Sequence, residues 1–134
     1  MSLPNGLNAI VGAQELHDWF GYWPSFHDAE IMSLHLNRHG LSFFLIHTWE
    51  MTSKVDERGF YVLEKHVVVE FVLEGVSEMD LCGFNHQNVI LGLSLERKDA
   101  EYVLTLDPCY GLGGTISVEK VSIRLQRGKP QSDG

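Results

Sequence analysis

The segment from Tyr22 to Ile31 constrains the fold most, because it joins two stretches of different hydrophobic period and carries several bulky rings itself. Pro24 fixes its own φ and disfavours the helical conformation for Trp23, so the segment is expected to be extended or turned. Aromatic side chains in such a connection usually fold back onto the core. We therefore predict that Trp23 and Phe26 are mostly buried and that the turn seals one end of the core.

Three polar residues in the same turn can form local hydrogen bonds. Ser25 and Asp28 belong to types that bond neighbouring backbone groups, and His27 can bridge a donor and an acceptor. We expect His27 or Asp28 to be hydrogen-bonded to backbone rather than presented to solvent. A second interpretation makes His27 and Asp28 an acid/base or metal-binding pair, but no second cluster in the sequence supports it.

A helical pattern precedes this turn and an alternating pattern follows it. Leu16, Trp19 and Phe20 are spaced as on one face of a helix, and Gly21 is placed as a C-terminal stop, so a short helix is predicted over residues 14–20. After the turn the hydrophobic period changes to two residues, which is typical of strands. The predicted strands cover residues 32–37, 41–48, 60–74, 76–81, 88–95, 102–107 and 115–125.

In two of these strands the residue pattern predicts which side faces the core. In the second strand the apolar residues Leu41, Phe43 and Leu45 stand at odd positions. Ser42 and Thr48 stand at even positions, so the odd-numbered side chains are expected to form the apolar face. The apolar residues that share one face of the third strand are Val67, Val69, Phe71 and Leu73.

The order of the elements predicts the fold class. Successive strands with short connections and no helical pattern between them favour antiparallel pairing. We predict an α+β domain in which a short N-terminal helix packs on a twisted, mainly antiparallel meander sheet of six to eight strands. The polar, irregular stretch 50–59 is expected to be the longest loop. The domain is expected to span residues 1–127, and the polar tail 128–134 is expected to fray.

The net charge of −8 is distributed unevenly along the chain. Residues 1–80 hold 12 acids and 4 bases, whereas residues 81–134 hold 6 of each. Nucleic-acid binding is disfavoured because it needs a basic surface, whereas a basic protein partner would be attracted. A charged face that only keeps the protein soluble would explain the same excess. The densest acidic residues are Glu64, Glu70, Glu74, Glu78 and Asp80.

Two features bear on the cellular compartment. No apolar run approaches the roughly 20 residues that span a bilayer, so a membrane is not an expected partner. Residues 1–10 lack the positive charge and the apolar stretch of a signal peptide. Cys82 and Cys109 are therefore expected to be reduced, partly buried thiols, and the cytoplasm is the expected compartment.

Seven histidines are present, and three of them fall on successive predicted strands. His35, His47 and His66 are conceivable as a three-histidine metal site on one sheet face. The strand phases argue against this site, because His35 alternates with the apolar residues of its strand whereas His47 shares the phase of its apolar neighbours. We expect no stoichiometric metal.

Other chemical motifs in the sequence are incomplete. Cys82 and His86 supply half of a zinc site, which Cys109 could complete only by chance of folding. The glycine-rich run 111–114 lacks the Lys-Ser/Thr of a phosphate loop and precedes a strand, so a glycine-rich hairpin or bulge is predicted. No carboxylate pair has the apolar setting that marks an acid/base couple, so no catalytic residue is expected.

One group of segments points to a known family. The most specific is the turn motif Trp23-Pro24-Ser25-Phe26-His27-Asp28, continued by Ala29-Glu30-Ile31. The others are residues 69–76, 81–84, 88–90 and 114–118. Together they cover nearly the whole globular part, and they resemble the immunity protein 50 family of bacterial polymorphic-toxin systems. In the last segment Ile116-Ser117-Val118 stands where we expect the family to have an aromatic residue followed by a cysteine.

The resemblance implies a non-catalytic protein, without a cofactor, that binds and neutralises a toxin made by the same bacterium. The expected partner is a cognate toxin domain. A nuclease is one such domain, and it is expected to be basic because its nucleic-acid substrate is negatively charged. The resemblance implies no toxin-contacting residues, and the turn motif is expected to be structural.

The acidic charges supply the candidate toxin-facing residues, which are Glu64, Glu70, Glu74, Glu78 and Asp80. Because side chains alternate along a strand, Glu64, Glu70 and Glu74 should project to the same side if no bulge intervenes. The alternative function is a β-rich module that binds a small ligand or a metal. Its support is the histidines and the aromatic residues Trp19, Trp23, Phe26, Phe43 and Trp49.

Overall fold

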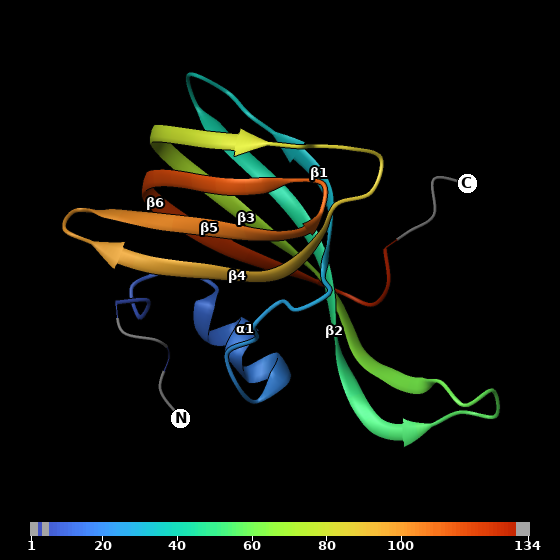
Figure 1. The fold of residues 1–134 in the computed structure, drawn as a ribbon. Coiled ribbons are helices and arrows are strands. Elements are labelled where there is room, and N and C mark those ends of the chain that lie inside the picture. The colour runs from blue at the N-terminus through green and yellow to red at the C-terminus, as the bar shows by residue number, and fades with distance from the viewer. Residues whose placement is uncertain (1–2, 4–5, 131–134) are drawn as a thin grey trace.

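The computed structural model describes Leu3 and residues 6–130. Over these residues it contains one helix and six antiparallel strands in one sheet (Figure 1), which confirms the α+β class. In chain order the elements are α1 (Ala13–Phe20), β1 (Glu30–His35), β2 (Leu41–Val55), β3 (Tyr61–Cys82), β4 (Val89–Lys98), β5 (Glu101–Tyr110) and β6 (Gly113–Arg127).

The strand order departs from a simple meander. β1, β2 and β3 form one antiparallel meander, and β4, β5 and β6 form a second. β3 pairs with β6, and β1 pairs with β4 where Glu30 lies opposite Val89. The sheet is therefore closed into a barrel, in which each meander supplies one half of the wall.

The core-facing side of β2 is the opposite of the predicted one. Phe44 and Ile46 are buried together with Ser42 and Thr48, whereas Leu41 is exposed. Ser42 tolerates burial because its hydroxyl accepts a hydrogen bond from the Asn37 N–H at 2.9 Å and donates one to the Asn37 carbonyl at 3.3 Å. The apolar residues of β2 stand at both odd and even positions, so hydrophobicity alone does not decide which side of the strand faces the core. The hydrogen bonds of Ser42 allow the even-numbered side to be buried.

β3 merges two predicted strands, residues 60–74 and 76–81, into one strand of 22 residues. Gly75 lies between them with a φ of 72° and bends the strand without ending it. The predicted inward face of β3 is confirmed, since all of its members are buried: Val67, Val69, Phe71 and Leu73.

Beyond the barrel, β2 and β3 continue as a projecting hairpin, here called the arm and defined as Glu50–Glu64 (Figure 1). The predicted loop over 50–59 is therefore wrong for residues 50–55, which belong to β2, and holds only for the turn that begins at Asp56. The polar side chains of this stretch instead bond across the hairpin: Thr52 Oγ1 donates to the Val62 carbonyl at 2.7 Å, and Asp56 Oδ1 accepts from the Phe60 N–H at 3.0 Å. These bonds let a polar sequence extend both strands.

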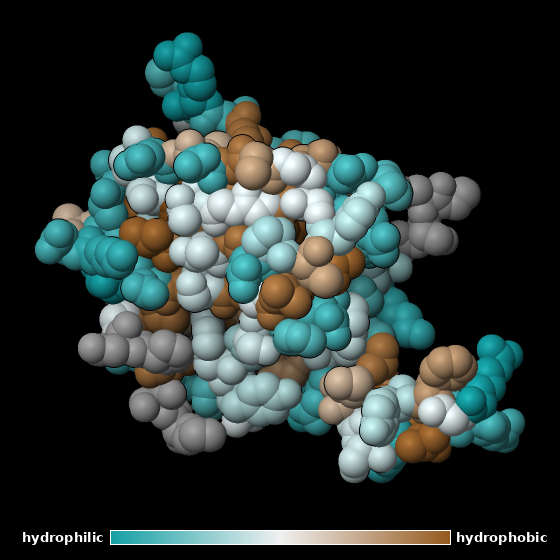
Figure 2. Space-filling model, viewed as in Figure 1, coloured by the Kyte–Doolittle hydropathy of each residue, from teal (hydrophilic) through white to brown (hydrophobic). Residues whose placement is uncertain are grey.

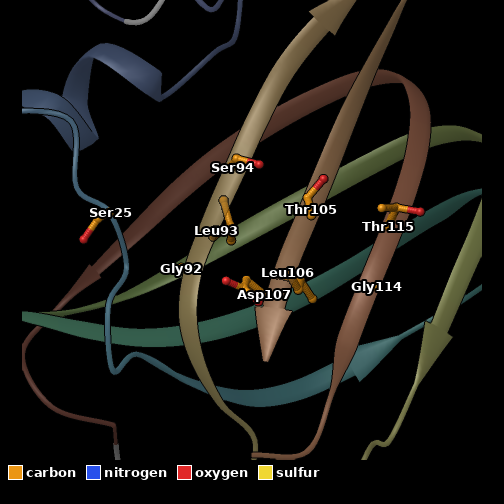
Figure 3. A pocket seen from close by; sticks show the side chains of 9 residues that line it. All are labelled: Ser25, Gly92, Leu93, Ser94, Thr105, Leu106, Asp107, Gly114 and Thr115. Carbon is orange, nitrogen blue, oxygen red and sulfur yellow. The ribbon is translucent and has the colours of Figure 1, made fainter. Parts of the chain in front are cut away.

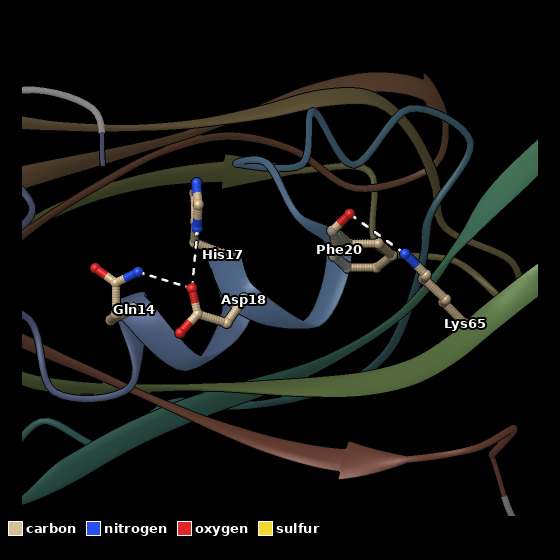
Figure 4. Close-up of polar contacts among 5 residues, drawn as sticks. All are labelled: Gln14, His17, Asp18, Phe20 and Lys65. Carbon is tan, nitrogen blue, oxygen red and sulfur yellow. Dashed lines mark hydrogen bonds and ion pairs between the residues drawn. The ribbon is translucent and has the colours of Figure 1, made fainter. Parts of the chain in front are cut away.

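Helix α1 confirms the predicted helix over residues 14–20, and Gly21 ends it in a left-handed conformation. Before the helix, Val11 accepts a hydrogen bond from the Ile123 N–H of β6 at 2.7 Å. At its end, Lys65 Nζ donates to the Phe20 carbonyl at 3.4 Å (Figure 4), and Trp19 Nε1 donates to the Lys65 carbonyl at 2.9 Å. The helix is therefore tied to β6 and to the base of the arm.

Candidate functional site

The turn motif closes the barrel with its backbone. The Asp28 N–H donates to the Ile90 carbonyl at 2.9 Å, and the Ile90 N–H donates to the Ala29 carbonyl at 3.0 Å. The Leu93 N–H donates to the Ser25 carbonyl at 3.1 Å. These bonds place the motif alongside β4, where β1 and β4 meet.

The apolar side chains of the motif face the core. Phe26 is 1% exposed and its ring lies 5.9 Å from that of Phe71, as predicted. Pro24 is also buried, whereas Trp23 is only half-buried and packs at the edge of the core. Phe26 has a φ of 63°, a conformation that few residues other than glycine adopt. The burial of this ring stabilises that unusual backbone.

His27 and Asp28 point outward, contrary to the prediction. Their side chains are 60% and 53% exposed and form an ion pair of 3.2 Å between Nδ1 and Oδ2. Asp28 has a φ of 65°, and its N–H is bonded to β4, so the turn presents both side chains to solvent. They line a groove of about 170 Å³ between the motif and residues 48–51 of β2.

The five candidate toxin-facing acids do not form one row. Thr48 pairs with Val67 and Glu50 with Glu64, so β3 has one residue more than β2 between these positions. Lys65 takes up this extra residue with a φ of 53°. The bulge moves Glu64 out of the phase of Glu70 and Glu74, and the predicted shared side holds only for the latter two.

Bases balance three of these acids. In each pair the carboxylate lies opposite or beside a cationic side chain. The pairs are Glu64 with Lys54 at 3.7 Å, Glu70 with Arg124 at 3.7 Å, and Glu74 with Lys120 in strand register. Glu78 and Asp80 differ, because Ser117 and Thr115 lie opposite them on β6. Both carboxylates are exposed.

Asp80 begins a row of polar residues that crosses four strands. Thr115 of β6 lies opposite Asp80, Thr105 of β5 opposite Thr115, and Ser94 of β4 opposite Thr105. Figure 3 shows the three hydroxyl residues on neighbouring strands around a hollow of about 490 Å³.

Further residues complete the lining of this hollow. Asp107 and Ser25 contribute polar groups, while Gly92 and Gly114 have no side chain to fill the space. No histidine is found among the described residues that line it. Sequence reasoning missed the hollow because its residues come from separate strands; the alternating hydroxyls of those strands were the available signal.

The three histidines considered for a metal site do not come together. His47 Nε2 and His66 Nδ1 lie 3.1 Å apart, whereas the His35 ring stacks on Phe43 at 4.4 Å, at the other end of the β1–β2 pairing. Burial lowers the pKa of both His47 and His66, and the positive charge of Lys129 lowers both further. Within the described part of the chain, no three His, Cys, Asp or Glu side chains are grouped to hold a metal ion.

The remaining motifs have structural positions. Cys82 and Cys109 are free thiols that are exposed rather than partly buried, so the expected burial is wrong. His86 Nδ1 lies 2.9 Å from Asn85 Oδ1. The glycine-rich run 111–114 forms the β5–β6 hairpin connection, as predicted. Buried Asn88 supports it, because its Oδ1 accepts a hydrogen bond from the Leu112 N–H at 3.0 Å.

The family assignment comes from a family model that matches most of the chain. Within Leu3 and residues 6–130, no helix is long and apolar enough to cross a membrane. No curated protein and no solved structure matches the chain significantly. The family model described as Immunity protein 50 matches residues 12–128, a range that includes the helix, the turn motif and the six strands described above. The chain therefore belongs to the immunity protein 50 family.

Proposed function

We propose that this protein is a non-catalytic immunity protein that binds and neutralises a cognate polymorphic toxin in the bacterial cytoplasm. Its membership of the immunity protein 50 family supports this function. The protein acts by occupying the toxin rather than by chemistry, and it uses no cofactor. The free thiols Cys82 and Cys109 fit a reducing compartment.

The pair of exposed carboxylates Glu78 and Asp80 supports the choice of a basic partner. Because hydroxyl residues rather than bases lie opposite them, these acids keep their negative potential. The adjoining hollow leaves room for a lysine or arginine side chain, which carboxylate and hydroxyl oxygens can bind. A toxin that cleaves nucleic acid is basic to suit its substrate, so a basic nuclease domain is the partner we propose.

The other three acids contribute less under this proposal. Glu64, Glu70 and Glu74 remain candidate toxin-facing residues, but a base accompanies each of them and reduces its field. The turn motif has a structural role in this proposal, because its backbone closes the barrel and Phe26 fills the core.

The test is binding to the toxin domain encoded beside this protein's gene. The unmodified protein should bind this domain and abolish its activity; a failure to bind would refute the function. The variants Glu78→Lys and Asp80→Lys should each slow association by about threefold to tenfold, with little change in dissociation. Glu15→Lys, on the exposed side of α1, changes the net charge equally and is the matched control. Equal slowing by all three variants would assign the effect to net charge alone.

A further inference from the structure

The arm has two open edges. The pairing of β1 with β2 reaches only Glu30 opposite His47, so beyond His47 no described strand pairs with this edge of β2, although the turn motif and Tyr22 lie beside residues 48–51. On the other side, β6 pairs with β3 only as far as Val67, and the last contact is the Gly128 N–H donating to the His66 carbonyl at 2.8 Å. Beyond Glu50 and Lys65, which contact Tyr22 and helix α1, the arm is a two-stranded ribbon that no other described strand flanks.

One face of this ribbon is apolar. Met51 lies opposite Leu63, and Val55 lies opposite Tyr61. Leu63 and Tyr61 are two apart in β3 and project to the same side. Met51 and Val55 each lie directly opposite one of them and so join that face, although the register of β2 is irregular between Met51 and Val55. Met51, Leu63, Val55 and Tyr61 are exposed by 60%, 39%, 57% and 59% respectively, and Phe60 at the tip is 66% exposed. Figure 2 shows hydrophobic residues on the projecting arm at lower right.

The opposite face of the ribbon is polar and internally bonded. Glu50 and Glu64 lie opposite each other, and Lys54 Nζ reaches Glu64 Oε1 at 3.7 Å. At the base, Glu50 Oε2 accepts a hydrogen bond from Tyr22 at 3.2 Å and lies 3.6 Å from Lys65 Nζ. This face is therefore satisfied within the molecule, whereas the apolar face is not.

The arm is held in shape without a partner. The cross-strand bond of Thr52 and the turn bonds of Asp56 fix the hairpin, and Trp19 anchors its base through the Lys65 carbonyl. A hairpin that is ordered in advance loses little conformational entropy on binding. An exposed apolar ribbon with open edges is otherwise an aggregation hazard, so such a surface marks an interaction site.

We infer that the apolar face of the arm is the docking surface for a basic protein, which under the proposed function is the toxin domain. Charge decides between a toxin and a second copy of this chain. The chain carries a net charge of −8, and the arm itself holds four acids and two bases. Two copies therefore repel each other, whereas a basic partner is attracted.

The arm and the acids Glu78 and Asp80 then have separate tasks. They lie toward opposite ends of β3. Exposed carboxylates act over a distance and raise the association rate, while buried apolar contacts chiefly slow dissociation. The arm is the part of the surface that supplies the buried contact.

The experiment compares two double variants in binding to the toxin domain encoded beside this protein's gene. Met51→Thr/Tyr61→Thr removes the centre of the apolar face and introduces threonine, a β-branched residue that favours strands. Leu41→Thr/Leu91→Thr is the matched control, because both leucines are exposed and lie outside the arm. The arm variant should dissociate at least about tenfold faster at an unchanged association rate, and the control should match the wild type.

The outcomes separate this inference from the proposed function. If the wild type binds the toxin domain and the arm variant dissociates from it at the wild-type rate, the arm is not the docking surface. The proposed function would still hold. Absence of wild-type binding would refute both. Sedimentation of the wild type alone supplies a further check: a dimer that the arm variant converts to a monomer would make the occupant a second copy and overturn the inference. Unchanged melting temperatures would show that both variants are folded.

Discussion

β3 has two parts with different surroundings. From Val67 to Leu73 it lies between β2 and β6, and alternate side chains are fully buried. At Tyr61 and Leu63 it has β2 alone beside it, and these side chains stay exposed although they are large and apolar. The two parts belong to one strand, so intrinsic strand propensity does not separate them. The presence of a second neighbour and an opposing layer decides whether an apolar face becomes core or surface.

With the docking surface inferred above, stability and binding would belong to separate parts of the molecule. Burial of apolar side chains in the barrel supplies most of the free energy that opposes unfolding. The arm adds little burial, so its face can change without unfolding the domain. Three predictions test this division.

The largest effect is expected from truncating an aromatic ring in the barrel part of β3. Phe71 is fully buried and stacks on Phe44 with 4.8 Å between ring centroids. Phe71→Ala should lower the free energy of unfolding by about 3–5 kcal/mol, because it leaves a cavity in the core. Tyr61→Ala in the arm should change it by no more than about 0.5 kcal/mol. Urea unfolding of both variants measures the contrast, and similar losses would contradict it.

Two glycines with positive φ, one in the barrel and one in the arm, allow the same comparison of barrel and arm to be made for the backbone. At Gly114 in the barrel, an added Cβ would lie 1.9 Å from the Asp80 carbonyl oxygen, whereas at Gly59 in the arm it would meet open space. Gly59→Ala should cost about 1–2 kcal/mol from its left-handed conformation alone. Gly114→Ala should cost about 2–5 kcal/mol, because strain and overpacking add. Thermal unfolding checks the order, which a more destabilised Gly59→Ala would reverse.

The smallest effect is expected at the junction of barrel and arm, where His47 meets His66. Their pKa values lie below the ordinary histidine value, chiefly because of burial. Between about pH 6.5, the ordinary histidine pKa, and the lower pKa values of the folded state, the unfolded chain binds more protons than the native state. The free energy of unfolding therefore decreases as the pH falls through this range. His47→Gln should make the free energy of unfolding less dependent on pH between about 5 and 8. An unchanged pH dependence would exclude this histidine as a contributor.

Local patterns predicted the elements that depend on neighbours in the sequence. The helix, its stop at Gly21 and the inward face of β3 follow from spacing alone. The phase of β2 did not, because buried Ser42 obtains its hydrogen bonds from Asn37 across a turn. Polar composition at 50–59 indicated a loop, whereas cross-strand bonds made an arm.

The candidate site was less accessible to sequence reasoning than the fold. Glu78 and Asp80 are exposed, but that they face a toxin stays a prediction. Sequence reasoning did not find the bases that balance the other three acids, because these bases come largely from β6. The hydroxyl row unites Ser94, Thr105 and Thr115 only through the register of separate strands. No local pattern carries that register.

The seam between the turn motif and β4 bears on the order in which the barrel folds. Its bonds, such as that between Asp28 and Ile90, join parts of the chain that are far apart in sequence, so the cost in loop entropy must be met before they form. The long pairing of β3 with β6 gives the two meanders another line of attachment. Because β1 and β4 share a single register pair whereas β3 and β6 pair over most of their length, the seam is expected to close last during folding and to open first. Under the proposed function, the speed of that closure would set how soon after synthesis the protein can neutralise its toxin.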